Sequence, residues 1–543
     1  MLASQRAEER PTWERGYTAD AVSLIWILSS LMKSSRSRAT VFAHGSLSRF
    51  FSKRTGPAVC IAIAVAVIGI SAVRVRSQTP TSGDRTVSFA ASEQPMTQSD
   101  WPRFLNRDFS GEAPLTDHAP ASFANLNWAD EPTCQWTLPV GDGYGIGVVR
   151  DGAYFHFDAI NGNERLRKIA MDNGQTLWTR EYPLNYRDMY GYETGPRCSP
   201  TIAKVGDGSG EVHIFTYGVA GELAAWNCET GEPLWSISMN ERYDVVQNFF
   251  GVGSSPLVLD QLVIVMVGGS PAEQQNLAPG RLDRAVPNGS LLVALDRHTG
   301  EEIWKCGDDL ASYSSPRTMT IDGKDYLLMF ARDHLWLIDP VGGKSLGKIY
   351  HRADILESVN AMVPVVKGNR VLISECYDAG AAHYEISVDD GTASFDPVWV
   401  DPVGRRRSQA LRSHMSTPVL HEGHLFACSG RNAPDSDFRC IELDTGKVKW
   451  SALERRRSTA TLMGDVLLVL KETGPLHIVR PNSEQYDEIA VWNLDQSAGI
   501  RPALQYPCWS APVVVGNQML VRGDQIVICL SLPGNNQPRK ETN

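Results

Sequence analysis

Thirteen residues recur with variations along this chain: Leu292-Val293-Ala294-Leu295-Asp296-Arg297-His298-Thr299-Gly300-Glu301-Glu302-Ile303-Trp304. An apolar segment runs into a polar turn with one glycine, and a second segment ends in tryptophan. Three further stretches repeat the spacing of four residues between glycine and tryptophan: Gly174 and Trp178, Gly231 and Trp235, Gly446 and Trp450. Such a repeat predicts a series of similar β-hairpins and therefore one repetitive all-β body.

Each residue type in the repeated turn has a physical role. Hairpin loops of three to five residues usually combine a type I turn with one residue at positive φ, and glycine adopts that conformation without steric strain. Asp, Asn and Thr stabilise such turns by accepting hydrogen bonds from nearby backbone N–H groups. A tryptophan at a fixed offset predicts packing in the same seam of every unit, with its N–H near a polar rim. We therefore interpret the repeated tryptophans as packing residues.

Weaker copies of the turn and a second element extend the repeat. The weaker turns are 337–343, with Gly347 where tryptophan is expected, 386–391 before Trp399, and 477–482 before Trp492. The second element precedes an apolar strand each time: Cys198-Ser199-Pro200, Ser254-Ser255-Pro256, Ser314-Ser315-Pro316, Met362-Val363-Pro364, Ser416-Thr417-Pro418 and Ser510-Ala511-Pro512. Together they predict seven to eight units of roughly 40–65 residues, the range of four-stranded propeller blades. The junction near 458–461 lacks the proline, which leaves the count open by one.

These units resemble a known repeat. Strand–Asp-x-x-Thr-Gly-x-x-x-Trp units that alternate with Ser-Ser-Pro starts are similar to the β-propeller repeat of the pyrroloquinoline-quinone (PQQ) type, and residues 101–108 are similar to the entry segment of many bacterial members. The resemblance covers about residues 100–532. It implies eight four-stranded blades and a last blade that combines strands 513–515, 519–521 and 526–530 with the region around 127–138. Such closure leaves no long open sheet edge.

Charge is distributed unevenly along the chain. The net charge is −10, yet residues 1–95 carry 12 Lys and Arg against 6 Asp and Glu, whereas the remainder carries 40 against 56. The content of 42% hydrophobic and 21% charged residues is ordinary for a globular body, and a repeat array of this length can be one domain. The acidic body argues against nucleic acid as a partner.

A membrane anchor is predicted before the repeats. Residues 58–73 are apolar, and no charged residue occurs from 55 to 73, which is just long enough to span a bilayer. Six Lys and Arg and no acid occupy 33–54, so more basic charge lies on the N-terminal side, although Arg74 and Arg76 follow. We predict a signal anchor at 57–73 with the propeller on the extracytoplasmic, periplasmic side; a cleaved signal sequence is the alternative.

The predicted organisation has five parts. A basic, disordered segment at 1–56 precedes the anchor at 57–73, a linker follows at 74–99, the propeller spans 100–532, and 533–543 form a disordered tail. Met32 begins a conventional basic-then-apolar leader. Met1 and Met32 are therefore both candidates for the native start.

The cysteines and two short basic runs are interpreted as structural features and not as functional motifs. Nine of the ten cysteines follow the predicted anchor, without CxxC spacing or an adjacent pair. They do not indicate a disulfide framework; most are interpreted as buried small side chains, with a bridge between Cys428 and Cys440 as the alternative. The basic runs 405–407 and 455–457 are interpreted as solvated surface.

The resemblance raises the question of a cofactor. Quinoprotein dehydrogenases of this fold hold the quinone over the central channel and typically use a vicinal Cys–Cys disulfide, a tryptophan floor, Ca²⁺ held by Glu and Asn, and an Asp base. This chain has no vicinal cysteines, no Cys-x-x-Cys-His haem motif and no acid cluster like a calcium loop. We assign no catalytic and no metal-binding residue, and PQQ with Ca²⁺ stays the open alternative.

The candidate ligand site is the mouth of the propeller channel. Loops that enter the innermost strands form this mouth, and here they precede the Ser-Ser-Pro elements. Their candidate ligand-binding residues are Tyr192, Glu193, Arg197, Asn248, Phe250, Tyr313, Glu357, Asn360, Arg412, His414 and Trp509. Aromatics, amides and both charge signs suit a polar organic ligand, a peptide or a sugar. Alternatively, these residues bond neighbouring blades to one another.

Two functions follow from these observations. The first is a membrane-anchored scaffold that binds a protein or a small polar ligand at the channel mouth, as in the bacterial outer-membrane assembly scaffold with similar repeats. The second is a divergent PQQ-dependent alcohol or sugar dehydrogenase. The missing cysteines and calcium ligands favour the scaffold.

Overall fold

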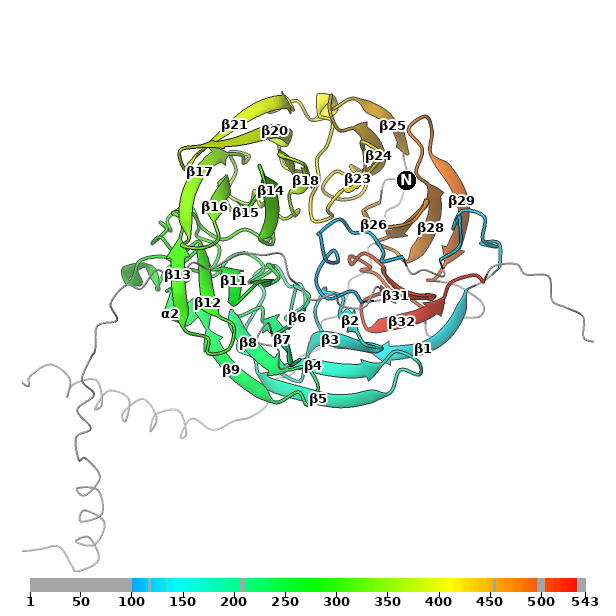
Figure 1. The fold of residues 1–543 in the computed structure, drawn as a ribbon, viewed down its shortest axis with the longest axis horizontal. Coiled ribbons are helices and arrows are strands. Elements are labelled where there is room, and N and C mark those ends of the chain that lie inside the picture. Colours follow the sequence, from blue (N-terminus) through cyan, green and yellow to red (C-terminus); the bar gives the residue numbers. More distant parts are fainter. Residues whose placement is uncertain are drawn as a thin grey trace, which may run out of the picture. The chain divides into compact units, whose positions relative to one another are not determined.

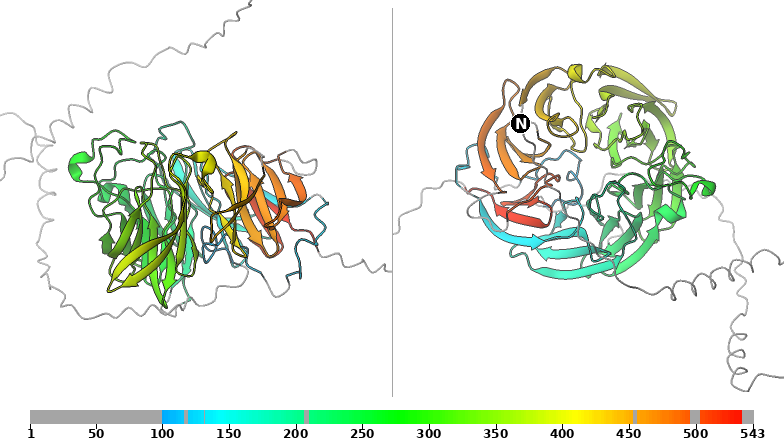
Figure 2. Two further views of the ribbon diagram at one scale, coloured as in Figure 1. Left: turned by 90° about the horizontal axis from the view of Figure 1, so that it is seen from above. Right: turned by 180° about the vertical axis from the view of Figure 1, so that it is seen from behind.

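Eight four-stranded antiparallel sheets form the blades of a ring in a computed structural model of the chain (Figure 1). The structure describes residues 100–115, 119–130, 132–205, 210–452, 456–495 and 503–534. Figure 2 shows the same ring from behind and from above. The predicted eight-bladed, all-β propeller is confirmed.

The predicted N-terminal parts of the chain lie outside the described residues. These are the segment at 1–56, the anchor at 57–73 and the linker at 74–99, and most of the predicted tail at 533–543 lies outside them as well. Among the described residues, no helix has both the length and the apolar character needed to cross a bilayer.

Seven blades each consist of four consecutive strands, and the first strand of each lies nearest the channel (Figure 1). The strands are β2 (Val148–Arg150), β3 (Ala153–Ile160), β4 (Asn163–Ala170) and β5 (Thr176–Pro183); β6 (Thr201–Lys204), β7 (Val212–Tyr217), β8 (Glu222–Asn227) and β9 (Pro233–Ser238); β10 (Leu257–Leu259), β11 (Leu262–Met266), β12 (Leu292–Asp296) and β13 (Glu302–Cys306); β14 (Arg317–Ile321), β15 (Lys324–Phe330), β16 (His334–Asp339) and β17 (Lys344–Tyr350); β18 (Val365–Lys367), β19 (Arg370–Glu375), β20 (Gly380–Asp389) and β21 (Thr392–Val400); β22 (Val419–His421), β23 (His424–Ser429), β24 (Asp437–Glu442) and β25 (Val448–Ala452); β26 (Ser458–Met463), β27 (Val466–Lys471), β28 (Pro475–Arg480) and β29 (Asp487–Asn493). One α-helical turn, α2 (Met239–Arg242), and two 3₁₀ turns, η1 (Ala272–Gln274) and η2 (Arg406–Ser408), lie in loops.

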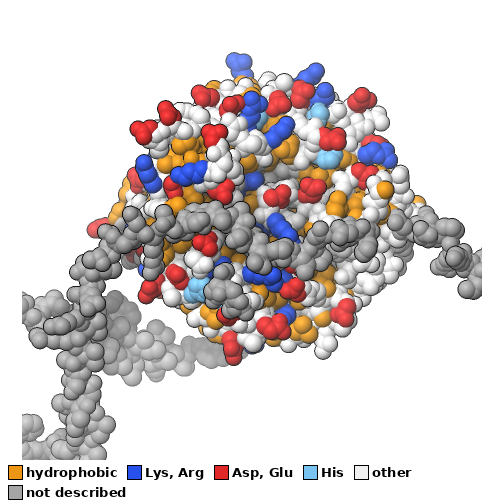
Figure 3. All heavy atoms as spheres, in the orientation of Figure 1, with side chains coloured by type: hydrophobic (Ala, Val, Ile, Leu, Met, Phe, Trp, Pro, Cys, Tyr) orange, Lys and Arg blue, Asp and Glu red, His pale blue; other side chains and the backbone are white. Residues whose placement is uncertain are grey.

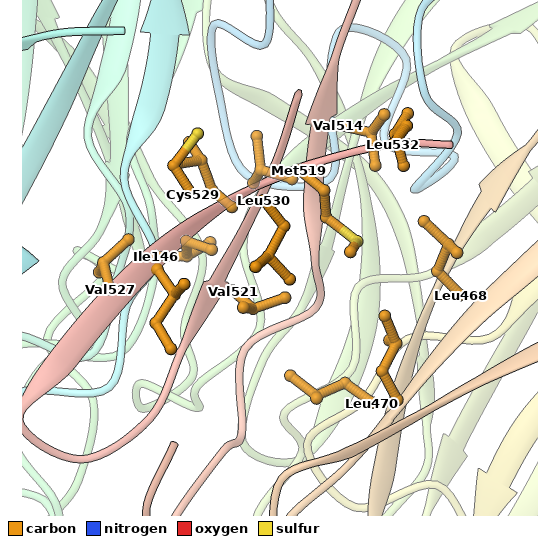
Figure 4. Close-up of a cluster of buried hydrophobic side chains, with 14 of the residues drawn as sticks. Ile146, Leu468, Leu470, Val514, Met519, Val521, Val527, Cys529, Leu530 and Leu532 are labelled. Atoms are coloured by element: carbon orange, nitrogen blue, oxygen red, sulfur yellow. The ribbon is translucent and has the colours of Figure 1, made fainter. Parts of the chain in front are cut away.

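The eighth blade closes the ring with strands from both ends of the described chain. β30 (Val513–Val515), β31 (Gln518–Arg522) and β32 (Ile526–Ser531) pair in sequence, and β1 (Thr133–Pro139) adds antiparallel to β32, with Leu138 opposite Val527. Buried side chains of β31 face those of β27 in the neighbouring blade, among them Val521 and Leu470 (Figure 4). The predicted closure is confirmed: strands from both ends of the described chain form one four-stranded sheet in the order β1-β32-β31-β30.

The repeated tryptophans join consecutive blades. Each indole N–H donates to a backbone carbonyl of the next blade or its adjoining segment at 2.7–3.1 Å: Trp136 to Met171, Trp178 to Glu229, Trp235 to Arg297, Trp304 to Pro340, Trp399 to Leu443, Trp450 to Asn482 and Trp492 to Trp128. The interpretation of these residues as seam packing is confirmed.

The repeated glycine is required by its conformation and by its neighbour. Gly343 has a φ of 67°, and a Cβ at this position would lie 2.5 Å from the ring of Trp304 in the preceding blade. In the best copy of the turn, the Asp296 carboxylate accepts hydrogen bonds from the backbone N–H groups of His298 and Thr299, both at 2.9 Å. Glycine and tryptophan recur together because the ring of one blade covers the turn of the next.

The Ser-Ser-Pro element forms a second link between blades, near the channel. The backbone N–H of Ser199 donates to the hydroxyl of Ser255 at 3.1 Å, and that of Ser255 donates to the hydroxyl of Ser315 at 2.9 Å. Thr417 accepts in the same way from the N–H of Val363 at 3.0 Å. In three of the elements, the hydroxyl of Ser255, Ser315 or Thr417 thus replaces water for a backbone N–H of the preceding blade.

Two further structural predictions have clear outcomes. Cys428 and Cys440 are free and buried; they lie opposite Phe438 and Phe426 rather than each other, so the alternative of a bridge between them is wrong. Over the face seen in Figure 3, acidic and basic side chains are interspersed. This distribution offers no single basic stripe for a nucleic acid on that face.

One buried carboxyl group predicts a pH dependence of stability. Glu164 of β4 is fully buried and accepts hydrogen bonds from the Tyr182 hydroxyl and the Val219 N–H, both at 2.7 Å. Burial raises the pKa of Glu164 to about 7. A raised pKa means that the stabilisation is complete below the pKa of the unfolded chain and is lost as the pH rises through 7. Between pH 5 and 8, we expect the free energy of unfolding of the wild type to fall by roughly 2–3 kcal/mol relative to that of Glu164→Gln.

Chemical denaturation of both proteins across this pH range measures the effect. Glu229→Gln is the control, because Glu229 is an exposed carboxylate, 86% accessible, and its curve should run parallel to that of the wild type. Equal pH slopes for wild type and Glu164→Gln would contradict the assignment.

Candidate functional site

The N-terminal segment of the described chain crosses the inside of the ring. Residues 101–113 hydrogen-bond to the innermost strands of four blades: Trp101 with Val149, Pro102 with Ile202, Asp108 with Arg317 and Ala113 with Leu462. Figure 1 shows this segment, in blue, within the ring. Segment 101–108, in which we recognised an entry motif, therefore fills part of the channel, and Phe104 and Leu105 form the inner end of a cavity.

This cavity opens where the loops enter the innermost strands, and its volume is about 210 Å³. Six of the eleven predicted residues line it: Tyr192, Arg197, Phe250, Tyr313, His414 and Trp509. Ser199, Gly253, Thr417 and Ser510, from the Ser-Ser-Pro elements or the residues beside them, line it as well. More than half of the residues predicted for the mouth thus share one cavity.

Five aromatic side chains from different loops form one wall of the cavity, which we call the aromatic wall: Tyr144, Tyr192, Phe250, Tyr313 and Trp509. Ring centroids follow one another at 4.7 Å from Tyr144 to Trp509, 6.1 Å from Trp509 to Tyr192, 5.5 Å from Tyr192 to Phe250 and 5.6 Å from Phe250 to Tyr313. Such spacing is typical of favourable aromatic pairs. The Tyr313 hydroxyl accepts a hydrogen bond from the Phe250 N–H at 2.9 Å, which fixes both residues.

The aromatic wall continues onto the surface of the mouth. Tyr190 lies 5.6 Å from Phe250, and Tyr506 lies 5.9 Å from Trp509, measured between ring centroids. Both tyrosines are more than half exposed. Exposed aromatic side chains next to an apolar cavity are typical of an interaction site rather than of ordinary surface.

Two arginines of the cavity lining contact the rings of the aromatic wall. The Arg197 guanidinium lies 5.0 Å from the ring centroid of Tyr144 and pairs with Asp188 at 2.9 Å. Arg457 lies 4.6 Å from the ring centroid of Trp509 and pairs with Glu472 at 2.8 Å. The interpretation of 455–457 as solvated surface is wrong for Arg457, whose side chain is only 14% exposed, because the ion pair and the indole ring hold it at the cavity.

The other five predicted residues do not line the cavity. Asn248 and Asn360 are buried and donate to backbone carbonyls, Arg412 pairs with Asp435, Glu357 is exposed, and Glu193 accepts a hydrogen bond from the N–H of Gly143. Burial and the neighbouring Asp524 raise the pKa of Glu193 to about 8. For Asn248 and Asn360, the alternative of bonds between neighbouring blades describes what the structure shows, whereas Arg412 bonds within its own blade.

Sequence reasoning missed Tyr144, Phe104, Arg457 and Thr459, which also line the cavity. Tyr144 and Arg457 precede the innermost strands β2 and β26, the two that lack a Ser-Ser-Pro start. The sequence feature that could have identified these two residues is their position before an innermost strand, because no Ser-Ser-Pro motif marks either strand. Phe104 had no local signal, because its place depends on how the entry segment crosses the ring.

A calcium-bound quinone does not match the groups at this mouth. The lining of the cavity contains two arginines and no carboxylate, whereas Ca²⁺ requires several carboxylate or carbonyl oxygens. Across the described ranges, no cluster of three or more His, Cys, Asp or Glu side chains is arranged to hold a metal ion. All nine cysteines there are single thiols. We therefore derive no redox step through PQQ for this chain.

Comparisons with known proteins agree with the fold and the repeat. A family model described as outer membrane protein assembly factor BamB matches residues 162–451. BamB of Shewanella oneidensis is 25% identical over 187 residues, which are 32% of this chain and 42% of that protein, so the match spans less than half of its length.

Two solved structures illustrate the architectural likeness. BamB from Moraxella catarrhalis shares 14% identity at a TM-score of 0.47, over 74% of this chain and 99% of that one. The quinohemoprotein alcohol dehydrogenase of Comamonas testosteroni shares 13% identity at a TM-score of 0.40, over 80% and 81%. The resemblance to the PQQ-type propeller repeat is confirmed, and because the family model covers more than half of the sequence, the chain belongs to the family of the outer membrane protein assembly factor BamB.

Proposed function

We propose that this protein is a membrane-anchored, extracytoplasmic scaffold that binds a partner protein at the mouth of its propeller. The predicted anchor at 57–73 would hold the chain at the membrane. Membership in the BamB family supports a role in assembling membrane proteins. The mouth residues predicted from the sequence are proposed as the binding surface where they line the cavity.

The observation that carries this proposal is the continuous aromatic surface from Tyr506 through Trp509, Tyr192 and Phe250 to Tyr190. Tyrosine, tryptophan and arginine are enriched among the residues that dominate binding energy at protein interfaces. The cavity beside this surface offers a pocket for an anchoring side chain. A partner would thus bury apolar area at the mouth, while the blades only position the loops.

Site-specific photocrosslinking in cells tests the proposal. A photoreactive phenylalanine in place of Tyr190 should give one discrete crosslinked product of a membrane-associated protein. The control position is Val341, which is 42% exposed in the turn between β16 and β17, at the opposite end of the blade. Added Tyr192→Ala and Trp509→Ala substitutions should weaken the product at position 190 at least tenfold, since truncation of a hot-spot aromatic at an interface costs about 2 kcal/mol or more. The same product at both positions, or none at 190, would reject the mouth as the interface.

The dehydrogenase alternative has its own measurement. Calorimetric titration of the full chain with PQQ should give the same result with and without Ca²⁺, because the cavity has no carboxylate to hold the ion. Stoichiometric binding of PQQ that requires Ca²⁺ would make the dehydrogenase the better hypothesis.

A further inference from the structure

The cavity has a polar side that the aromatic wall does not explain. Its members are His414, Ser416, Arg457 and Thr459, from the loop before β22 and from the start of β26. Two buried polar atoms on this side, the Thr459 hydroxyl and Nδ1 of His414, have no hydrogen-bond partner among the described residues. Buried polar atoms are nearly always paired in native proteins, so two orphans in one cavity indicate a missing partner.

Arg457 lines the same cavity and adds a cationic donor. Its Nε donates to Glu472 at 2.8 Å and its Nη2 donates to the Tyr506 hydroxyl at 3.3 Å. In the part of the chain that the structure describes, Nη1 has no hydrogen bond. The guanidinium plane is held against Trp509, so its remaining N–H groups have a fixed direction. Arg457 and Thr459 line the same cavity, and a preorganised guanidinium together with an unpaired hydroxyl is a typical receptor for a carboxylate.

His414 contributes a neutral nitrogen. Burial, together with the positive charges of Arg457 and Arg431, lowers the pKa of His414 to about 3, so the ring is neutral at physiological pH. One ring nitrogen bonds to the backbone of Arg431. Because that nitrogen is the donor, Nδ1 presents a lone pair, which accepts a hydrogen bond from an N–H group.

We propose that the cavity binds an aromatic carboxylate, with the carboxylate on Arg457 and Thr459 and the ring against the aromatic wall. The absence of any carboxylate from the lining favours an anion, and the five aromatic side chains favour a flat apolar group. The inner end, at Phe104 and Leu105, is apolar as well. The carboxylate can come from a free aromatic acid or from the C-terminal residue of a chain. This inference rests on the proposed function, since it names the group that a partner would insert at the mouth.

Calorimetric titration of the full chain in detergent distinguishes these cases. The probes are N-acetyl-phenylalanine, its primary amide and 3-phenylpropionate. N-acetyl-phenylalanine should bind with one-to-one stoichiometry, and the amide at least tenfold more weakly, because it loses a charge-assisted pair. If 3-phenylpropionate binds equally well, a free acid is the source; if it binds more weakly than N-acetyl-phenylalanine, the N–H on His414 indicates a chain terminus. Equal binding of acid and amide, or no binding of either, overturns the proposal.

Two variants locate the carboxylate. Thr459→Val keeps the shape of the side chain and removes the orphan hydroxyl, so affinity for N-acetyl-phenylalanine should fall about tenfold. Arg457→Lys keeps the charge opposite Glu472 and removes the planar donor pair, with a loss at least as large. Ser436→Ala is the matched control, because the Ser436 hydroxyl is also buried and without a hydrogen-bond partner among the described residues, and Ser436 does not line the cavity. Unchanged affinity in both Thr459→Val and Arg457→Lys overturns the placement.

The experiments can reject the carboxylate site and the scaffold function independently of each other. Loss of probe binding with an intact crosslink at position 190 would reject the carboxylate site and leave the protein-binding mouth. Probe binding without a crosslink would support the carboxylate site and reject the scaffold function.

Discussion

Replacement of Trp304 by alanine should lower the free energy of unfolding by about 3–5 kcal/mol, the range for a large buried aromatic side chain. Trp304 is 7% exposed, its ring covers Gly343 of the next blade, and its indole N–H donates to the carbonyl of Pro340 at 3.1 Å. Truncation therefore opens a cavity in the seam and leaves a carbonyl without its partner. Urea unfolding of wild type and variant measures the difference.

A neighbouring residue gives the control for this prediction. Ile303 precedes Trp304 on the same strand, β13, and is 54% exposed. Ile303→Ala removes an apolar side chain that the fold does not bury, and its effect should stay within about 0.5 kcal/mol. Comparable losses in the two variants would show that strand propensity, and not the seam, determines the effect.

Neutralisation of Asp158 should be similarly destabilising, by about 3–5 kcal/mol in Asp158→Asn. Asp158 of β3 is fully buried and accepts hydrogen bonds from Arg165 at 2.7 and 2.8 Å, from Arg167 at 2.8 Å and from the Gly141 N–H at 2.8 Å. Without the carboxylate, two guanidinium groups remain with little access to water. Thermal and chemical unfolding at pH 7 should both record the loss.

The same carboxylate predicts how the free energy of unfolding changes at acidic pH. Burial alone would raise the pKa of Asp158, but the hydrogen bonds from Arg165 and the charges around it hold the pKa well below its usual value. A depressed pKa means stabilisation that is present above the unfolded value and lost as the pH falls. The difference in free energy of unfolding between wild type and Asp158→Asn should therefore become smaller as the pH falls from 5 to 2. Asp283→Asn is the control, since Asp283 pairs with Arg281 at the surface, where ion pairs contribute little; an equal loss there would contradict the prediction.

The binding proposals depend on loops rather than blades. Trp304 belongs to a seam that most blades repeat and Asp158 to the interior of one blade, whereas Tyr144, Arg457 and Thr459 lie in the cavity at the mouth. A variant such as Thr459→Val should therefore alter affinity without altering the ring. Stability and binding are thus separable by experiment in this protein.

By itself, the sequence determined the repetitive architecture. The spacing of Gly300 and Trp304, and its copies, predicted the hairpins and the seam, because local turn chemistry and one large side chain act within a single repeat and its neighbour. The Ser-Ser-Pro starts predicted where further units begin, whereas the resemblance to the PQQ-type repeat implied the closure by strands 513–515, 519–521 and 526–530. The repeated turns and starts are encoded within a few residues each, so one copy supports the interpretation of another.

Only the tertiary structure decided which residues share the cavity. Phe104 lies there because residues 101–113 cross the ring, Tyr144 and Arg457 because β2 and β26 occupy innermost positions without the motif, and Asn360 is excluded because its amide bonds three backbone carbonyls. Such placements depend on contacts between residues hundreds of positions apart, as between Tyr144 and Trp509. No local pattern encodes these distances, since each depends on how the whole ring closes.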